Sequence, residues 1–240
     1  MVSSDSTSSY APLIDLVRDR ATSSPFLVGV AGPVAVGKTT IVQALASGLE
    51  AEGRSANTLS TDAFLLSNQT LNERGLLMRK GFPESYDDGA IRTVLGALRA
   101  GEVARVHVYS HETYDVVPDT TQLIAPADVI LVEGIVALQP PTVEHLDLAI
   151  YVDAPEPRVR EWFVERFVRL TAAAAGDAAS FYRPFADMPP EQVRQIAEGT
   201  WDGINAPNLH AHIAPSAARA DVVVVKAADH SIAELRVVSR

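Results

Sequence analysis

The sequence contains no cysteine, which excludes disulfide bonds, thiolate nucleophiles and zinc–thiolate sites. It has no apolar run of membrane-spanning length, and residues 1–9 carry one acidic and no basic residue, unlike a secretory leader. Basic residues are also scarce: 20 Lys and Arg face 30 Asp and Glu, and the formal net charge is −10. This balance opposes a general affinity for nucleic acid or an anionic membrane. We therefore expect a cytoplasmic protein that binds neither, with any phosphate site formed by a few local groups.

The composition does provide enough apolar material for a core, with 47% hydrophobic and 21% charged residues among 240. These proportions are typical of globular proteins, and the sequence has no repeat of fixed period. We predict a flexible N-terminus with a short helix over residues 1–24 and a single domain over residues 25–240. The Ser-rich opening is expected to be frayed, and the helix is indicated by apolar residues at helical spacing, namely Tyr10, Leu13, Ile14 and Val17. A homodimer is compatible with this composition.

Short apolar segments alternate with segments of helical periodicity along the rest of the chain. The pattern predicts strands over residues 26–31, 55–61, 103–109, 128–134, 148–152, 221–226 and, at a sheet edge, 235–238. It predicts helices over residues 38–52, 88–101, 156–175 and 190–203, with an irregular functional insertion over residues 62–86. This alternation favours an α/β fold with a mostly parallel central sheet, helices on both faces and ligands outside the carboxyl ends of the strands.

The strongest motif, Gly32-Pro33-Val34-Ala35-Val36-Gly37-Lys38-Thr39, fits GxxxxGK[ST] between a predicted strand and a predicted helix. In this motif, backbone N–H groups and the positive helix end surround nucleotide phosphates, Lys38 adds a positive charge and the Thr39 hydroxyl ligates Mg²⁺. An ordinary turn would need neither Lys38 nor Thr39. We therefore predict a P-loop NTPase three-layer fold that binds ATP and Mg²⁺. The predicted nucleotide-binding residues are Gly32, Val34, Ala35, Gly37, Lys38, Thr39 and Thr40.

Two carboxylates are expected at the same edge of the sheet as this loop. Asp62 follows the second predicted strand, where it could orient and deprotonate an acceptor hydroxyl. The alternative for Asp62 is a helix cap or an ordinary turn residue, since Asp commonly follows a strand. Glu133, near the end of the strand over residues 128–134, could bind Mg²⁺ through water or hold Thr39. The alternative for Glu133 is a carboxylate satisfied by backbone N–H groups.

Four arginines lie on the helix predicted over residues 156–175. For Arg158 and Arg160 we favour a solvated helix face. Arg166 is the better catalytic candidate, because phosphoryl transfer develops charge that a delocalised guanidinium meets better than an ammonium does. These residues alone indicate a kinase or another NTPase.

A longer stretch extends the match beyond the P-loop. Residues 60–87, STDAFLLSNQTLNERGLLMRKGFPESYD, resemble the signature segment of bacterial type I pantothenate kinases, within the uridine kinase and phosphoribulokinase group. Further matching segments are residues 108–111 with 114–115, 131–134, 151–155, 204–205 with 208–209, and Lys226 with His230. The resemblance covers the chain from about residue 26 to the C-terminus.

The resemblance implies an ATP-dependent kinase that transfers the γ-phosphoryl group to a primary hydroxyl of a small molecule, with pantothenate the best single acceptor. It implies that Lys38 and Thr39 hold the phosphates and Mg²⁺. It further implies that Asp62 is the base on the acceptor hydroxyl and that Arg166 stabilises the transferred group.

The resemblance also assigns ligand contacts: Tyr109, His111, Tyr114 and Asn208 around the acceptor, and His230 beside the adenine. Each residue has a plainer interpretation that the residue type alone would favour. His111 and Tyr114 could be satisfied polar groups in a core, and Asn208 could be a turn residue. His230 could cap a helix.

The chain departs from the family at several positions. Phe163 and Phe185 stand where the acceptor pocket is expected to have aromatic hydroxyls, and a lost hydroxyl can change acceptor choice strongly. Gln43 stands where the family has a basic residue that meets the phosphates of coenzyme A, so we expect weak inhibition by coenzyme A. The longer N-terminal region of the family is mostly missing, which affects the expected nucleotide pocket.

Two other functions remain open at this stage. One is a paralogous kinase for another hydroxylated metabolite, such as a nucleoside or a polyol. The other is a nucleotide-dependent switch or binding module that hydrolyses ATP slowly. A carboxylate such as Asp62 beside an open acceptor pocket favours transfer, because a switch needs no acceptor.

Overall fold

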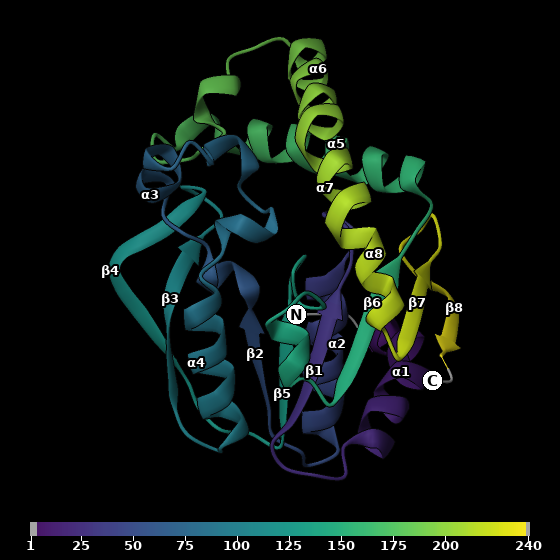
Figure 1. Cartoon of the computed structure of the whole chain (residues 1–240). Coiled ribbons are helices and arrows are strands. Elements are labelled where there is room, and N and C mark those ends of the chain that lie inside the picture. The colour runs from purple at the N-terminus through teal and green to yellow at the C-terminus, as the bar shows by residue number, and fades with distance from the viewer. Residues whose placement is uncertain (1–3, 239–240) are drawn as a thin grey trace.

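The computed structural model describes residues 4–238, with side chains from Ser9 onward (Figure 1). Its helices are α1 (Ser4–Arg20), α2 (Lys38–Ala51), α3 (Asn68–Glu73), α4 (Asp88–Arg99), α5 (Glu156–Ala173), α6 (Pro190–Thr200), α7 (Ala206–Asn208) and α8 (Ala214–Ser216). Its strands are β1 (Phe26–Ala31), β2 (Ala56–Ser60), β3 (Ala104–Ser110), β4 (Asp115–Ile124), β5 (Val129–Glu133), β6 (Leu148–Asp153), β7 (Val222–Lys226) and β8 (Ile232–Val237). Within the described residues, no helix combines the length and the apolar character needed to cross a membrane.

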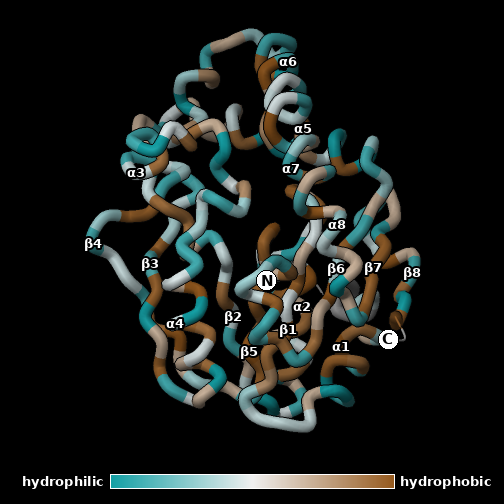
Figure 2. Tube along the Cα trace, in the orientation of Figure 1, coloured by the Kyte–Doolittle hydropathy of each residue, from teal (hydrophilic) through white to brown (hydrophobic). Residues whose placement is uncertain are grey.

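A six-stranded sheet with the order β2-β5-β1-β6-β7-β8 forms the centre of the fold. Five strands run parallel, and β8 pairs antiparallel with β7 at one edge. The inner strands are rich in Val, Leu, Ile and Ala, and much of the tube along them is brown in Figure 2. Because the strands share a direction, the loops that follow them meet at one edge of the sheet. This mostly parallel sheet confirms the predicted fold class.

Alternate residues of the central strands pack into two cores, one on each face of the sheet. On β5, Val129 and Leu131 join a core with α1 and α2, whereas Ile130 and Val132 join a core with α4 and the β3–β4 hairpin. All four side chains are fully buried. Burying such a side chain stabilises the fold by about 1.5–3 kcal/mol, so a one-residue slip in register would be costly.

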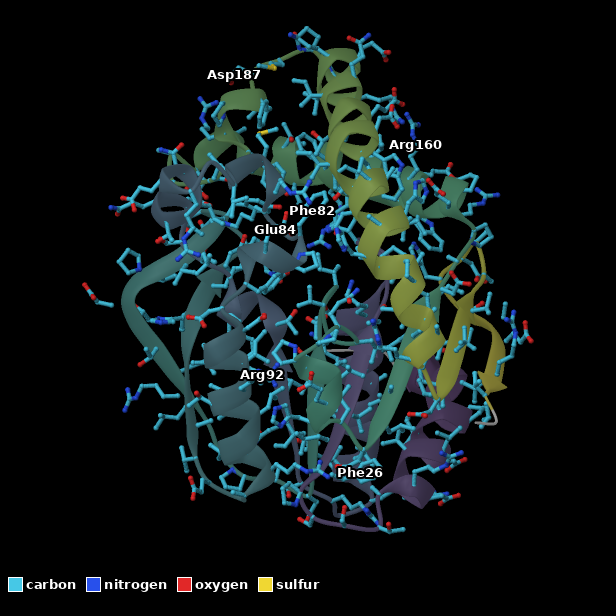
Figure 3. All side chains as sticks on the ribbon, viewed as in Figure 1. Phe26, Phe82, Glu84, Arg92, Arg160 and Asp187 are labelled. Carbon is cyan, nitrogen blue, oxygen red and sulfur yellow. The ribbon has the colours of Figure 1, made fainter. Side chains whose placement is uncertain are left out.

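Helices α5 and α6 form a lobe above the sheet in the view of Figure 1. The lobe has a small core of its own, with Val164, Phe167, Val193 and Ala197 at its centre. In Figure 3, Phe26 at the start of β1 lies at the bottom of the molecule, whereas Phe82 and Glu84 lie between the sheet and the lobe. The segment over residues 62–86 therefore lies toward the carboxyl ends of the strands, on the side of the lobe.

The structure differs from the predicted elements at four places. The segment over residues 62–86, expected to be irregular, contains the short helix α3 (Asn68–Glu73), which Ser67 caps. Helix α1 begins at Ser4, so the described part of the Ser-rich opening is helical rather than frayed, and residues 1–3 lie outside the described range. Strand β4 is absent from the predictions and forms a separate two-stranded sheet with β3. The helical run that begins at Pro190 continues beyond Gly203 to Arg219 through two π-helical turns.

Proline explains two of these differences. Pro118 lies within β4 and argues against a strand, but the β3–β4 register shifts between His107 and Tyr109, and a proline is tolerated at such an irregularity. Pro207 and Pro215 argue against a continuous helix, yet each occupies an early position of a new short α-helical segment. The π-helical turns between these segments accommodate the interrupted hydrogen bonding. Ser, which is frequent in the opening, also suits the N-terminus of a helix.

Candidate active site

The loop between β1 and α2 has the backbone that the phosphate-binding motif requires. Gly32 has φ +148° and Gly37, the N-cap of α2, has φ +95°, values that residues with a Cβ adopt only with strain. A Cβ on Gly32 would lie 2.3 Å from the Val152 carbonyl oxygen. Ala35, half-buried like Val34, also has a positive φ of 65°. The loop thus turns around the N-terminus of α2, where a helix favours an anion.

Lys38, the first residue of α2, folds back over this loop. Its Nζ donates hydrogen bonds to the carbonyl oxygens of Gly32, at 3.1 Å, and Pro33, at 2.9 Å. Burial lowers the pKa of the Lys38 ammonium, and the carboxylates of Glu133 and Asp62 partly oppose this shift. The ammonium therefore lies between the loop backbone and the two carboxylates predicted at this edge.

Thr39 and Glu133 come together as the sequence predicts. The Thr39 Oγ1 donates a hydrogen bond to the Glu133 Oε1 at 3.2 Å, and both Thr39 and Thr40 are exposed. Burial raises the pKa of Glu133, while Lys38 and the hydrogen bond from Thr39 lower it. A hydroxyl and a carboxylate are oxygen ligands that suit Mg²⁺. Among the described residues, no group of three or more His, Asp or Glu could hold a metal, so a cation here would also need phosphate or water oxygens.

Asp62 lies in the turn that follows β2, with 25% of its side chain exposed. Ser60 caps this turn by accepting a hydrogen bond from the Asp62 N–H, so Asp62 is not the capping side chain. The Asp62 carboxylate accepts no hydrogen bond from the residues that the structure describes, and its Oδ2 lies 3.8 Å from the His111 Nε2. Burial raises the pKa of Asp62, against opposing effects from His111, Lys38, Lys80 and Arg166. Asp62 is therefore a partly buried carboxylate among cations, with its oxygens available to a ligand.

The arginines of α5 divide into two groups. Arg158 pairs with Glu161 on the same helix at 2.7 Å, and Arg160 lies 3.5 Å from Asp202, as expected for a solvated face. Arg166 is exposed and has no ion-pair partner among the described side chains. It is close enough to Asp62 and Lys38 to lower the pKa values of both. Arg166 therefore acts electrostatically on residues at the carboxyl edge of the sheet.

The β3–β4 hairpin brings three of the predicted acceptor residues together. The centroid of the Tyr109 ring lies 5.2 Å from that of the His111 ring and 6.2 Å from that of the Tyr114 ring, and both pairs are edge-to-face. Tyr114 has a positive φ of 54° and stacks on Phe181 of the lobe at 4.7 Å. We call the rings of Tyr109, His111 and Tyr114 the aromatic wall. It lies next to the Asp62 carboxylate, because His111 is beside Asp62.

Lys80 lies against the aromatic wall but is absent from the residues that the sequence predicts. Its Nζ donates hydrogen bonds to Asn68 Oδ1 and to the Tyr114 carbonyl oxygen, both at 2.6 Å, and lies 4.0 Å from Asp115 Oδ1. The ammonium also lies 5.0 and 4.9 Å from the ring centroids of Tyr109 and Tyr114. Burial lowers the pKa of Lys80 to about 8. Lys80 lies within the matching segment, but no spacing rule distinguishes it from an ordinary surface lysine.

Asn208 reaches the site through the loop that carries Lys80. Its Nδ2 donates a hydrogen bond to the Gly81 carbonyl oxygen at 2.9 Å, while its buried Oδ1 has no hydrogen-bond partner among the described residues. Asn208 lies between two π-helical turns, Trp201–Asn205 and Leu209–Ile213, and π-helical turns occur often at functional sites. The structure therefore places Asn208 next to Gly81, the residue that follows Lys80.

His230 lies in the turn between β7 and β8, away from this wall. Its ring centroid is 4.1 Å from that of Trp162 on α5, with the ring planes 30° apart. Burial lowers the pKa of His230, and the ammonium of Lys226 lowers it further. Since β7 is parallel to β1 and β6, this turn lies at the same edge of the sheet as the phosphate-binding loop.

The two phenylalanines that depart from the family pattern both pack in the lobe. The ring of Phe163 packs against the rings of Phe167 and Trp201, with centroid distances of 6.2 and 5.8 Å. Phe185 lies 5.8 Å from Phe167. Phe163 and Phe185 are only half-buried, so both leave some apolar surface exposed on the lobe. The lobe contacts the aromatic wall through Phe181, which stacks on Tyr114.

Comparisons with known proteins concern the family and the fold. The model of the phosphoribulokinase / uridine kinase family matches residues 27–160. A pantothenate kinase of Chelativorans sp. (strain BNC1) is 41% identical over 231 residues, which cover 90% of this chain and 72% of that protein. A pantothenate kinase of Streptococcus pneumoniae serotype 19F (strain G54) is 40% identical over 222 residues, with 89% and 72% covered. The fold is similar to that of D-glycerate 3-kinase from Cryptococcus neoformans var. grubii, with a TM-score of 0.67, 14% identity and coverage of 95% and 98%.

Proposed function

The chain belongs to the phosphoribulokinase/uridine kinase family and is an ATP-dependent kinase that acts on a hydroxyl of a small molecule, and we propose that this acceptor is pantothenate. The observation that carries the proposal is the 41% identity to a pantothenate kinase over 90% of this chain. That alignment is long enough to include the phosphate-binding loop together with most of the proposed acceptor residues.

The proposed donor site consists of the loop over residues 32–37 and the first residues of α2. Loop N–H groups and Lys38 bind the phosphates, and the Thr39 hydroxyl and Glu133 carboxylate would hold Mg²⁺. When bound, Mg²⁺ supplies charge neutralisation on the β- and γ-phosphate oxygens. Lys38 already lies over the loop, where its two carbonyl contacts hold the ammonium beside the α2 N-terminus.

Asp62 is the proposed general base. Its carboxylate accepts the proton of the acceptor hydroxyl as the hydroxyl oxygen bonds to the γ-phosphorus and the bond from that phosphorus to the β–γ bridging oxygen breaks, which releases ADP. The raised pKa of Asp62 favours this proton transfer, because a base works best with a pKa closer to the operating pH. Arg166 stabilises the charge that develops on the transferred group, since it acts electrostatically on Asp62 and Lys38 and has no ion pair of its own among the described residues.

The chemistry of pantothenate suits the groups around Asp62. Pantothenate has a carboxylate, an amide and two hydroxyls. The described residues offer donors and acceptors for each, namely Lys80, Tyr109, His111, Tyr114 and Asn208. The carboxylate of pantothenate would make a strong charge-assisted contact with the buried Lys80 ammonium. The apolar side chains of the lobe would contact the hydrocarbon part.

The proposal is tested by ATP consumption with a panel of acceptors. Pantothenate should stimulate ADP formation well above a nucleoside and a polyol, and mass spectrometry should find one phosphoryl group added to it. Preferential turnover of a nucleoside or a polyol would identify a paralogous kinase instead. ADP formation that no acceptor stimulates would favour the slow nucleotide switch.

A further inference from the structure

Only three of the 20 basic residues in the chain are lysines: Lys38, Lys80 and Lys226. The first two lie in the site described above. Lys226 is the last residue of β7 and therefore also lies at the carboxyl edge of the sheet, although it is only 3% exposed. Lysines are almost never this buried without a strong partner. The burial of Lys226 therefore calls for a functional explanation.

The partner of Lys226 is Tyr10 of the N-terminal helix. The Lys226 Nζ donates a hydrogen bond to the Tyr10 hydroxyl at 2.9 Å and lies 5.0 Å from the centroid of its ring. Within the described side chains, no carboxylate lies within ion-pair distance of this ammonium, and the phenol is its one hydrogen-bond acceptor. A neutral phenol offsets the desolvation of an ammonium only in part. The pair therefore persists at a cost to stability.

Lys226 also begins the turn that carries His230. The register between β7 and β8 shifts between Val225 and Lys226, as in a β-bulge. Hydrogen bonds from Ala227 N–H to the Ser231 carbonyl oxygen, at 2.9 Å, and from His230 N–H to the Ala227 carbonyl oxygen, at 3.0 Å, then close the turn. Lys226 is thus the residue at which this turn leaves the sheet.

His230 is held in an uncommon conformation at the tip of the turn. Its φ is +65°, which is rare for a residue with a Cβ, and such outliers gather at functional sites. Its exposed ring lies against the buried Trp162 at 4.1 Å. Burial and the Lys226 ammonium both lower the pKa of His230, which favours the neutral form of the ring.

Tyr10 connects this turn to the phosphate-binding loop. It lies on α1, which packs along α2, and α2 begins at Lys38 of the loop. Tyr10 and residues of α2 such as Ile41 share one core. The buried Tyr10–Lys226 contact thus joins α1 to β7, beside the helix that binds the phosphates.

We propose that Tyr10 and Lys226 are positioning residues for the nucleoside subsite of the phosphoryl donor. The pair fixes the turn over residues 227–231 so that the His230 ring, supported by Trp162, stacks on the base while the loop holds the phosphates. Removing the pair lowers the affinity for the nucleoside part of the donor and leaves phosphate binding intact. This inference rests on the proposed donor site, because it requires phosphates in the loop over residues 32–37.

The test compares two ligands that share phosphates but differ in the nucleoside. Calorimetry measures the binding of ADP and of inorganic tripolyphosphate, each with Mg²⁺, to the wild type and to Tyr10→Phe. We expect Tyr10→Phe to weaken ADP binding about 3- to 10-fold, the range of one lost hydrogen bond, and to change tripolyphosphate binding by less than about twofold. In a His230→Ala background, Tyr10→Phe should weaken ADP binding no further, because the pair acts through His230.

Two further variants separate positioning from stability. Tyr10→Phe combined with Lys226→Met removes both polar partners, so it should melt near the wild-type temperature but still lose ADP affinity selectively. Tyr151→Phe is the matched control, because Tyr151 is 3% exposed and Tyr10 5% exposed in the same core, and this variant should bind both ligands normally. Equal losses for both ligands, or no loss for ADP, in Tyr10→Phe and the double variant would overturn the inference. A wild type that binds no tripolyphosphate would instead contradict the proposed donor site.

Discussion

The Lys80 ammonium should make acceptor binding depend on pH in the alkaline range. Burial lowers the pKa of Lys80 to about 8, so the group is charged below that pH and loses its charge as the pH rises through it. If the ammonium pairs with the acceptor carboxylate, the KM for pantothenate is lowest below pH 8 and increases above it. At pH 9 about one Lys80 in ten remains charged, which predicts a KM about tenfold higher than at pH 7.

The assay measures initial rates against pantothenate concentration at saturating ATP, from pH 7 to pH 9.5. Saturating ATP removes the contribution of Lys38, whose pKa is also lowered but which contacts the donor loop. Lys80→Met should have a high KM that changes little with pH, because it has no charge to lose. Lys80→Arg should keep a guanidinium charge throughout and therefore show a flatter profile than the wild type.

Two results would refute this reasoning. A wild-type KM that stays constant from pH 7 to pH 9.5 would show that the acceptor does not depend on the ammonium. A Lys80→Met profile that rises as steeply as the wild-type profile would assign the titration to another group. Either result would leave Lys80 as a structural residue that ties Asn68 to the Tyr114 carbonyl.

Three further substitutions test other parts of the site. Arg166→Lys should lower kcat at least tenfold with less effect on ATP affinity, because an ammonium cannot make a planar bidentate contact; equal changes in both would place Arg166 on a solvated face. Asn208→Ala should raise the KM for pantothenate about 3- to 10-fold by releasing the Gly81 carbonyl, and a normal KM would remove Asn208 from the acceptor site. Gln43, exposed on α2, should give only weak inhibition by coenzyme A, and Gln43→Arg should strengthen it in a titration at fixed ATP; potent inhibition that the substitution leaves unchanged would exclude control by this position.

The elements that local chemistry determines could be predicted from the sequence. The apolar run of β1, the glycines after it and Lys38 define the strand, loop and helix that begin the fold. Asp87 directly precedes α4, and its side chain accepts a hydrogen bond from the Ala90 N–H, as is typical of an N-cap aspartate. The edge position of Asp62 and Glu133 follows from the strands that precede them, because parallel strands end together.

Features that depend on contacts distant in sequence could not be predicted in the same way. Strand β4 is largely polar and exposed, and it forms because β3 offers a pairing partner. The depressed pKa of Lys80 arises from burial beside Tyr109 and Tyr114, which follow it by about 30 residues in the sequence, and Asp115 opposes this shift. The Tyr10–Lys226 contact joins residues that are 216 positions apart. No periodicity or spacing indicates such pairs.

The central claim is that Asp62 promotes phosphoryl transfer from ATP to pantothenate, and a single-turnover measurement on Asp62→Asn tests it most directly. Calorimetry should find near-normal ATP binding, while rapid-quench measurement of phosphorylated pantothenate should find a rate about 10² to 10⁴-fold below wild type, the usual contribution of a general base. Asp88→Asn, which changes an exposed carboxylate on α4, should match the wild type in both measurements. Phosphorylated pantothenate formed by Asp62→Asn at the wild-type rate, with normal ATP binding, would contradict the account.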